Sequence, residues 1–460
     1  MKRDIFDKVD SAEYARQAKP GLTAALIEKI VQDKGEPDWM KEIRLRGWKL
    51  FQEKKLPQFG PDLSGLKFDG LIYYLLPGEI KGTDSWDSVS PEIKATFERL
   101  GIPEAERAYL AGAGAQYESV NVYHHLQQRW QSQGVIFLDM DEAIREYPDI
   151  VRQYFMTKCV PIGDHKFSAL HAAVWSGGSF IYVPKGVKVT QPLQAYFRMN
   201  ARNLGQFEHT LIIMDEGSEA HYIEGCSAPK YDSGFSLHAG CVEIILKKNA
   251  KLRYSSVENW SHNTYNLNTK RAIVEAGAHM EWVGGNFGSG ITMLYPCSIL
   301  KGRGASCEHL GLAFANKDQQ IDTGAKVYHL ASDTSSRVVM KSVSKAGGRS
   351  TYRGLLQVAK NATNITAASK CDALILDDQS VSETIPDIQV SDNNVLVSHE
   401  ASVGKVGEEQ LLYLMSRGLT REEAMGMIVN GFVDPVMKQL PLEYSVELNR
   451  LIELEMEGIG

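Results

Sequence analysis

The stretch Gly217-Ser218-Glu219-Ala220-His221-Tyr222 combines a turn-forming residue, a small residue and an alternation of polar with small or apolar side chains. The same pattern returns five times further along the chain. The later copies cover residues 249–254, 277–282, 304–309, 333–338 and 361–366. Their first residues follow one another at intervals of 32, 28, 27, 29 and 28 positions, so the middle of the chain is an internal repeat of nearly constant length.

This repeat predicts a parallel β-helix. Alternation with period 2 is typical of a strand that buries one face, and the Gly, Asn or Asp that opens each copy tolerates a turn. The period is shorter than the roughly 40–50 residues of a propeller blade and has no helical half. We therefore expect a mainly β chain whose core, residues 156–402, is a right-handed parallel β-helix.

Helical domains are expected on both sides of this core, because the end coils of a solenoid otherwise expose unpaired edges. Helical patterns occur before the core at residues 23–34, 38–53, 91–100, 119–131 and 141–154. After it come a helix at 408–417, a second from the capping box at Thr420 and Glu423 to Gly431, and a third from Pro441 to Met456. The predicted flanking domains are residues 1–155 and 403–460.

Bulk composition excludes several classes of function. The net charge of -7 argues against nucleic-acid binding, which depends on basic side chains that neutralise phosphates. No run of eighteen apolar residues predicts a membrane span, and the polar first residues lack the apolar core of a signal peptide. We expect a cytoplasmic protein. It has no complete phosphate-binding loop, which predicts that it does not hydrolyse ATP by itself.

Cysteine spacing matches neither a zinc ribbon nor a ferredoxin, so the six cysteines are expected to be free thiols. Cys371 is a candidate reactive centre, because a nearby Lys370 ammonium would favour its thiolate. His399 follows it by 28 residues, which is one repeat, so one of His399 and Glu400 could stack on it. In an extended strand, His399 and Glu400 point to opposite faces and cannot both reach Cys371.

Two further positions carry polar groups of interest. Cys226 lies between a glycine and a proline at an expected corner, where a thiol would be more accessible than within a strand. Arg198 and Asn200 alternate with Phe197 and Met199, so the two pairs are expected on opposite faces of one strand. A solvated outer face explains the polar pair, whereas an inward orientation would imply a polar conduit through the β-helix.

Several segments of the chain, in order, resemble the SufB/SufD family of the SUF iron–sulfur cluster assembly machinery over nearly its full length. The segments are Phe180-Ile181-Tyr182-Val183-Pro184-Lys185-Gly186, Gly205-Gln206-Phe207-Glu208, Tyr222-Ile223-Glu224-Gly225-Cys226-Ser227-Ala228-Pro229, Lys370-Cys371-Asp372, His399-Glu400-Ala401 and Met427-Ile428-Val429-Asn430-Gly431-Phe432. The resemblance implies a non-catalytic scaffold on which a labile cluster is assembled and then passed to apo iron–sulfur proteins.

The resemblance also implies roles for individual residues. Cys226 corresponds to the sulfur-accepting cysteine, and Cys371 to the cysteine that holds the nascent cluster at a subunit interface, with His399 and Glu400 as adjoining ligands. The implied internal sulfur path comprises Arg198, Asn200, Trp260 and Lys270. A mixed thiolate, imidazole and carboxylate shell would hold a cluster weakly enough to release it.

The chain departs from the family pattern at two positions near these sites. Ser398 replaces a glutamate found in enterobacterial relatives, which makes a three-residue ligand set doubtful within one subunit. Glu258 replaces a glutamine on the implied path and adds a negative charge there. Some ligands of the cluster are therefore expected to come from a partner subunit.

The family implies several partners. The β-helix pairs with a second copy or with SufD, and the C-terminal helices dock the ABC-type ATPase SufC, which hydrolyses the ATP. Sulfur arrives as persulfide from a cysteine desulfurase with a sulfur-transfer protein. Flavin binding stays open.

Two alternatives belong to other classes of function. A purely structural SufD-like subunit is one, although the presence of both Cys226 and Cys371 favours the SufB side of the family. A β-helical polysaccharide lyase is the other, with acidic candidates at Asp377, Asp378, Asp387 and Asp392. Turn-forming aspartates at coil corners explain those four residues better.

Overall fold

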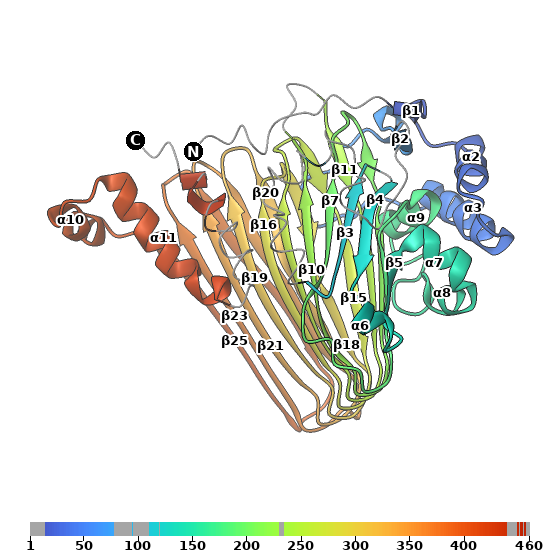
Figure 1. Cartoon of the computed structure of the whole chain (residues 1–460). Helices are drawn as coiled ribbons and strands as arrows, with labels where there is room; N and C mark the ends of the chain where they lie inside the picture. The colour runs from blue at the N-terminus through green and yellow to red at the C-terminus, as the bar shows by residue number, and fades with distance from the viewer. Residues whose placement is uncertain are drawn as a thin grey trace.

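The computed structural model describes residues 14–77, 94, 110–118, 120–229, 234–438, 449, 451–453 and 455–456. Its centre is a parallel β-solenoid of two facing sheets, and helices lie outside both sheets (Figure 1). The solenoid confirms the predicted mainly β fold with a parallel β-helix core and helices toward both ends of the chain.

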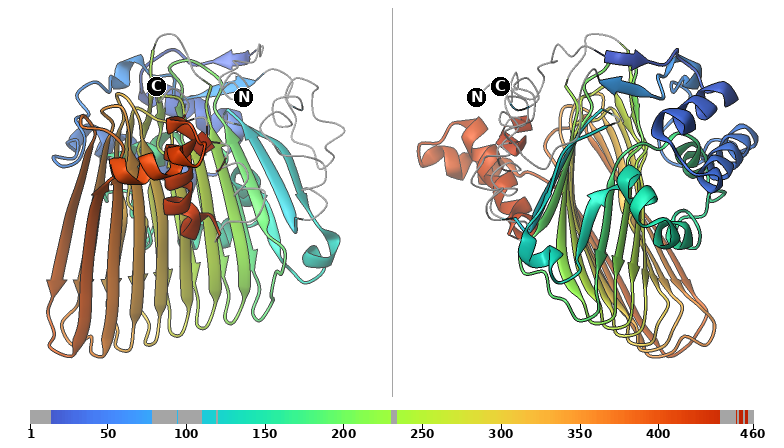
Figure 2. Two further views of the ribbon diagram at one scale, coloured as in Figure 1. Left: turned by 90° about the vertical axis from the view of Figure 1, so that its left-hand side faces the viewer. Right: turned by 45° about the vertical axis from the view of Figure 1, so that its right-hand side comes forward.

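One sheet contributes a single long strand to each coil, and we call it the long-strand sheet. Its strands lie side by side in chain order (Figure 2, left) and pair in parallel register. They are β7 (Leu193–Arg198), β10 (Glu219–Ser227), β13 (Lys251–Asn259), β16 (His279–Phe287), β19 (Ser306–Ala315), β21 (Ser335–Ser344), β23 (Ile365–Ile375) and β25 (Val395–Lys405).

The facing sheet is divided in its first coils into two short strands per coil, and we call it the split-strand sheet. Its first set comprises β6 (Ser179–Val183), β9 (His209–Met214), β12 (Cys241–Leu246), β15 (Thr269–Val274) and β18 (Cys297–Leu300). Its second set comprises β8 (Gly205–Gln206), β11 (Ser236–His238), β14 (Thr264–Asn266) and β17 (Ile291–Leu294). β20 (Gln320–His329) pairs with both β17 and β18, and β22 (Arg349–Val358) and β24 (Val381–Val390) continue it as single strands.

The repeat predicted from sequence lies at the corners that precede six of the eight long strands, from β10 to β23. All six opening residues have positive φ, between 59° at Asn249 and 73° at Gly304, which is the left-handed region expected of Gly, Asn and Asp. Five strands begin two residues after their opener, as at Glu219. In the last copy the strand begins only at Ile365, because Asn364 adds a second left-handed residue to the corner.

N-terminal helices cover the outer face of the split-strand sheet (Figure 2, right). They are α2 (Ala24–Lys34), α3 (Asp38–Glu53), α7 (Met140–Glu146), α8 (Pro148–Tyr154) and α9 (Lys166–Val174). Met40, Phe155 and Trp175 pack there against Phe180 and Leu211 of the sheet. Burial of these large apolar side chains holds the helices on the solenoid.

The N-terminal region also contributes strands. β3 (Gly112–Tyr117) pairs in parallel with β7, and β4 (Val120–Leu126) extends that sheet antiparallel. β5 (Ile136–Asp139) pairs antiparallel with β6, and β1 (Tyr14–Gln17) pairs with β2 (Leu75–Pro77). The remaining short elements are the 3-10 turn Phe68–Gly70 and α6 (Gln128–Gln131).

The helix predictions are confirmed at most positions. α2 and α3 match the predicted segments, and the prediction at 141–154 is divided into α7 and α8 at Pro148. The predicted helix at 119–131 is wrong, because β4 occupies most of it: Val120, Val122 and Tyr123 favour a strand. The predicted segment 91–100 lies almost wholly outside the described residues.

At the C-terminal end, α10 (Glu408–Ser416) and α11 (Arg421–Met437) lie outside the long-strand sheet (Figure 1). Thr420 and Glu423 form the predicted capping box. The predicted stop at Gly431 is wrong, and the helix continues to Met437. Val429 and Val433 of α11 pack on Leu312 and Val343, so burial on the sheet outweighs the helix penalty of a glycine. Most of the predicted third helix lies outside the described residues.

The solenoid is open at its last coil. Among the described strands, β24 pairs only with β22, and β25 pairs only with β23. Apolar side chains on these two strands are exposed, among them Ile385, Ile388 and Leu396. Unpaired strand edges with apolar side chains are typical of a surface that another chain covers.

Candidate functional site

Cys226 points into the solenoid from near the end of β10 in the long-strand sheet. It pairs with Phe197 of β7 and Glu258 of β13, and it belongs to the interior core together with Tyr222 and Tyr254. Its exposed fraction is 1%. The prediction of an accessible corner thiol is therefore wrong, because β10 extends through Ser227 before the chain turns.

Three carboxylates and one ammonium share this part of the interior. The Lys270 ammonium donates to Glu258 at 2.8 Å and lies 3.5 Å from Glu224. Trp260 donates its indole N–H to Glu258 at 3.4 Å. Burial alone would raise the pKa of Glu258, but the Lys270 ammonium and a neighbouring His238 more than offset this and lower it. Burial raises the pKa of Glu224 in spite of Lys270, which is farther away.

The third carboxylate, Glu208, forms a buried pair with His238. Nε2 of His238 faces Oε1 of Glu208, and Nδ1 lies 2.9 Å from the side-chain oxygen of Asn266. Asn266 donates its amide to Glu258 at 2.5 Å, which fixes its oxygen toward the ring. Both ring nitrogens therefore face acceptors. Burial acts to lower the pKa of His238, but the Glu208 carboxylate more than compensates and the pKa is raised.

The Cys226 thiol lies against this acidic group. Burial raises its pKa well above the ordinary value, and Glu224, Glu208 and Glu258 raise it further, whereas Lys270 opposes them. The sulfur, the Glu208 carboxylate and a ring nitrogen of His238 lie within 4.8 Å of one another. The thiol is thus protonated at neutral pH and has metal-ligating groups beside it.

The structure brings Trp260 and Lys270 together with Cys226 but places Arg198 and Asn200 elsewhere. Phe197 and Met199 face the interior core, as the alternation predicts. Arg198 lies on the other face of β7 and donates to the Ser227 hydroxyl at 3.1 Å. Neither Arg198 nor Asn200 is solvated, because both are buried.

Cys371 lies inside the last coils. It pairs with Met340 of β21 and Ala401 of β25 and is 5% exposed. Burial raises the pKa of its thiol to about 11, although a contact with Thr384 opposes this. Lys370 does not favour the Cys371 thiolate as expected, because it projects from the opposite face of the strand. It donates to Glu400 at 3.1 Å instead.

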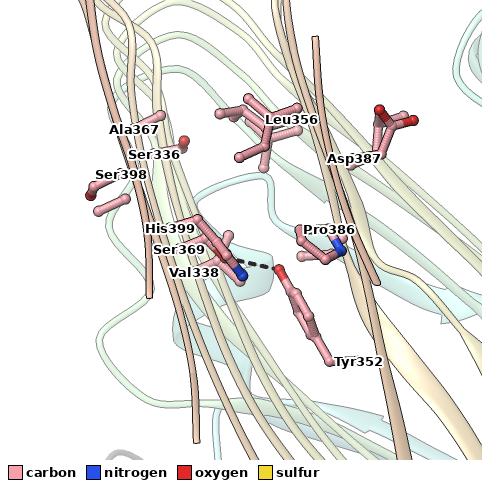
Figure 3. A pocket seen from close by; sticks show the side chains of 16 residues that line it. Ser336, Val338, Tyr352, Leu356, Ala367, Ser369, Pro386, Asp387, Ser398 and His399 are labelled. Carbon is pink, nitrogen blue, oxygen red and sulfur yellow. Dashed lines mark hydrogen bonds between the residues drawn. The ribbon is translucent and has the colours of Figure 1, made fainter. Parts of the chain in front are cut away.

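His399 and Glu400 point to opposite faces, as predicted. Figure 3 shows His399 and Tyr352 directed toward each other, and their rings stack with centroids 6.3 Å apart. Nε2 of His399 has no hydrogen-bond partner among the described residues. Glu400 is exposed outside the sheet. The expected stacking on Cys371 is wrong, because Ala401 pairs with Cys371 and His399 pairs with Ser369, two residues away on the same face.

Three cavities follow one another along the interior. The first is lined by Lys270, Trp282 and Met340, the second by Met340, Tyr352 and Cys371, and the third by Tyr352 and His399. Each shares a lining residue with the next. A series of cavities with shared lining residues therefore follows the interior from Lys270 to His399.

A second group of buried ligand atoms lies on the outer face of the split-strand sheet, under α9. It consists of His171, His209 and Cys241. His171 contacts the Ala239 carbonyl oxygen at 3.0 Å and His209 at 3.0 Å. His209 in turn lies 3.3 Å from Glu243, whose pKa burial raises to about 8. Both ring nitrogens of His171 are thus hydrogen-bonded, whereas Nε2 of His209 has no hydrogen-bond partner among the described residues.

The acidic candidates for a lyase site are structural. Asp377 accepts the backbone N–H groups of Gln379 and Ser380, and Asp392 accepts that of Asn394. Asp378 forms an ion pair with Lys405, and Asp387 accepts a hydrogen bond from Gln389 at 3.0 Å. Asp377 and Asp392 are thus turn-forming residues, as the sequence predicts.

Comparison with known proteins identifies the family. The sequence model of the SUF system FeS cluster assembly SufBD core domain matches residues 197–432, and that of the SufBD protein N-terminal region matches residues 115–195. The chain belongs to the SufBD family. It is 52% identical over 442 residues to the iron–sulfur cluster assembly protein SufB of Bacillus subtilis, covering 96% of this chain and 94% of that protein.

Two staphylococcal members of the SufBD family are similar to the same degree. The iron–sulfur cluster assembly SufBD family proteins of Staphylococcus saprophyticus and Staphylococcus epidermidis are each 52% identical, over 96% of this chain and 94% of their own length. The resemblance inferred from sequence segments is thus confirmed: the chain is a SufB-type iron–sulfur cluster assembly protein of the SUF system. None of the helices in the described part of the chain combines the length and the apolar character needed to cross a membrane.

Proposed function

We propose that this SufBD-family chain is the scaffold on which iron and persulfide sulfur become an iron–sulfur cluster, for transfer to apo-proteins. Cys226 accepts the sulfur inside the solenoid. Cys371 holds the nascent cluster near the open end, with His399 as an adjoining ligand from the same face. Glu400 lies on the outer face, so it can act as a cluster ligand only after a rearrangement or at an interface with a partner subunit.

The series of cavities from Lys270 to His399 is the observation that supports this proposal best. It joins the surroundings of Cys226 to those of Cys371 through the interior, with Met340 and Tyr352 as the shared walls. Lys270 lines the Cys226 end of this route, and Trp260 lies beside it through its hydrogen bond to Glu258. Arg198 on the far face of β7, and Asn200 just after β7, act by supporting the strand on which Phe197 faces Cys226.

The proposal includes the partners that the family suggests. The open strands β24 and β25 receive SufD or a second copy of the chain, which supplies further cluster ligands. SufC docks on α10 and α11 and hydrolyses the ATP. A cysteine desulfurase with its sulfur-transfer protein delivers persulfide to Cys226.

Replacement of Cys371 by alanine is expected to reduce cluster formation at least twofold, because a soft thiolate ligand for iron is lost. The measurement is anaerobic reconstitution of the full chain with ferrous iron and sulfide, followed by visible absorption and by iron and sulfide content. Cys307→Ala is the matched control, since Cys307 is also buried inside the long-strand sheet but lies near neither proposed site. Equal absorption in wild type and Cys371→Ala would refute the role of Cys371.

A further inference from the structure

Polar atoms without partners line the interior beside Cys226. Both side-chain atoms of Gln206 and Oε2 of Glu208 are buried and have no hydrogen-bond partner among the described residues. Gln206 pairs with His238 in the strand register, so its amide lies next to the ring that contacts Glu208. Because buried polar groups are almost always satisfied, these three unpartnered atoms indicate that a water or an ion binds to them.

The groups around these atoms form a donor set for a metal. The sulfur of Cys226, a carboxylate oxygen of Glu208 and a ring nitrogen of His238 lie within 4.8 Å of one another. Because bonds of about 2.0–2.3 Å to such ligands hold the ligand atoms roughly 3–4 Å apart, the Glu208–His238 hydrogen bond must open to admit the ion. Thiolate, imidazole and carboxylate together suit a divalent first-row metal such as iron, zinc or cobalt, and not calcium or magnesium.

We propose that Cys226, Glu208 and His238 bind ferrous iron inside the solenoid, so that iron and sulfur are loaded at the same thiolate. The choice of iron among first-row metals rests on the proposed assembly function, whereas the site itself rests on the donor set. Gln206 lies beside this site, where its amide can bind a water on the metal.

The backbone leaves room for this arrangement at Gly240. A Cβ atom at this position would lie 2.3 Å from Oε1 of Glu208 and 3.3 Å from Nε2 of His238. Any larger residue would therefore displace the carboxylate from the ring. Gly240→Ala thus moves one ligand without removing it.

Metal binding is balanced in charge. A divalent ion releases two protons, one from the Cys226 thiol and one from Nε2 of His238, so the net charge of the buried group is unchanged. No electron is transferred, because ferrous iron binds without a change of oxidation state. Glu224 and Glu258 add carboxyl groups around the proposed site. The Lys270 ammonium donates to Glu258 rather than to Glu208.

The His171, His209 and Cys241 group serves as an internal comparison. Its rings are hydrogen-bonded to each other and to the Ala239 carbonyl oxygen, as His238 is to Glu208 and Asn266, but its three ligand groups include no carboxylate. Cys241 has the same exposed fraction as Cys226, 1%. Cys241→Ser is therefore a matched control for burial and residue type.

The test is an anaerobic titration of the full apo chain with cobalt(II) in the absence of sulfide, followed by the cobalt–thiolate charge-transfer band. Wild type is expected to show the band at one equivalent, and ferrous iron should compete for it. Cys226→Ser should abolish the band, and Glu208→Gln and Gly240→Ala should weaken cobalt binding at least tenfold. Cys371→Ala and Cys241→Ser should retain the wild-type affinity.

Absence of the band in wild type, or its persistence in Cys226→Ser, would overturn the inference. A band that depends on Cys371 alone would also overturn it while leaving the proposed scaffold function intact. Glu208→Gln removes half of a buried ion pair, so circular dichroism must show that the variant is folded. If it is not, Cys226→Ser, which changes one atom, decides the result.

Discussion

Replacement of Lys270 by methionine is expected to lower the free energy of unfolding by about 3–5 kcal/mol, because it leaves buried carboxylates without their counter-charge. Lys270 is 3% exposed and donates to Glu258 at 2.8 Å, with Glu224 at 3.5 Å. Burial acts to lower the pKa of Lys270, but Glu258 and then Glu224 outweigh it and raise the pKa. Methionine has a similar length and keeps the packing, so the loss is electrostatic.

The loss of unfolding free energy in Lys270→Met should increase with pH. Burial acts to raise the pKa of Glu258, and Lys270 is the strongest influence against it, so the pKa of Glu258 in the folded variant is expected to rise. A carboxyl group with a raised folded-state pKa destabilises the fold increasingly as pH rises above its unfolded-state pKa. The difference between wild type and Lys270→Met should therefore be smallest near pH 4.5 and grow toward neutral pH, as measured by urea unfolding across that range.

Two variants check the interpretation. Adding Glu258→Gln to Lys270→Met removes the stranded charge and should recover part of the lost stability. Lys247→Met breaks a more exposed pair with Asp215 at 3.3 Å and should cost less than about 1 kcal/mol. A pH-independent loss in Lys270→Met would show that packing, and not charge, is responsible.

Residues that open each coil made the fold predictable, because their left-handed geometry restricts the choice of side chain. Gly217 and Asn249 have φ of 68° and 59°, and the strands begin at fixed distances after them. The two corners have the same geometry, so the ninth residue after each opener falls on the same face of the sheet. These residues are Cys226 and Glu258, which pair as neighbours. The sequence alone could have given this contact by aligning the openers.

The Cys371 region was less predictable because the coil length changes there. A second left-handed residue, Asn364, delays β23, so Cys371 pairs with Met340 rather than with the residue at the same distance from its opener. The next coil is 30 residues long at this position, since Cys371 pairs with Ala401. The spacing of 28 therefore predicted the correct face for His399 but the wrong register.

Sequence reasoning missed Glu208 and His238, although Glu208 lies in a segment that resembled the family. His238 ends β11 of the split-strand sheet, and Glu208 lies in the link between β8 and β9. The short strands of this sheet are separated from the openers by loops of variable length. No fixed spacing relates them to Cys226. A buried histidine whose ring nitrogens both face oxygen atoms is visible only in three dimensions.

Substitution of Leu412 and Met427 by glutamate is expected to weaken binding of SufC at least about 100-fold. These side chains, on α10 and α11, are 60% and 54% exposed, although Val429 and Val433 of α11 are buried on the sheet. Burial of one such side chain in an interface contributes about 1.5–3 kcal/mol, and 2.7 kcal/mol corresponds to about 100-fold in affinity. The α10 helix lies at the edge of the molecule, away from the solenoid, where a partner can reach it (Figure 1).

The measurement is calorimetric titration of SufC, with nucleotide, into the folded double variant. Leu396→Glu is the matched control, because Leu396 is 69% exposed but lies on β25 at the open end of the solenoid. That variant should bind SufC normally and lose affinity for SufD or for a second copy of the chain. Wild-type SufC affinity in the Leu412 and Met427 variant would exclude this surface as the docking site, whereas loss in Leu396→Glu would place SufC at the open strands instead.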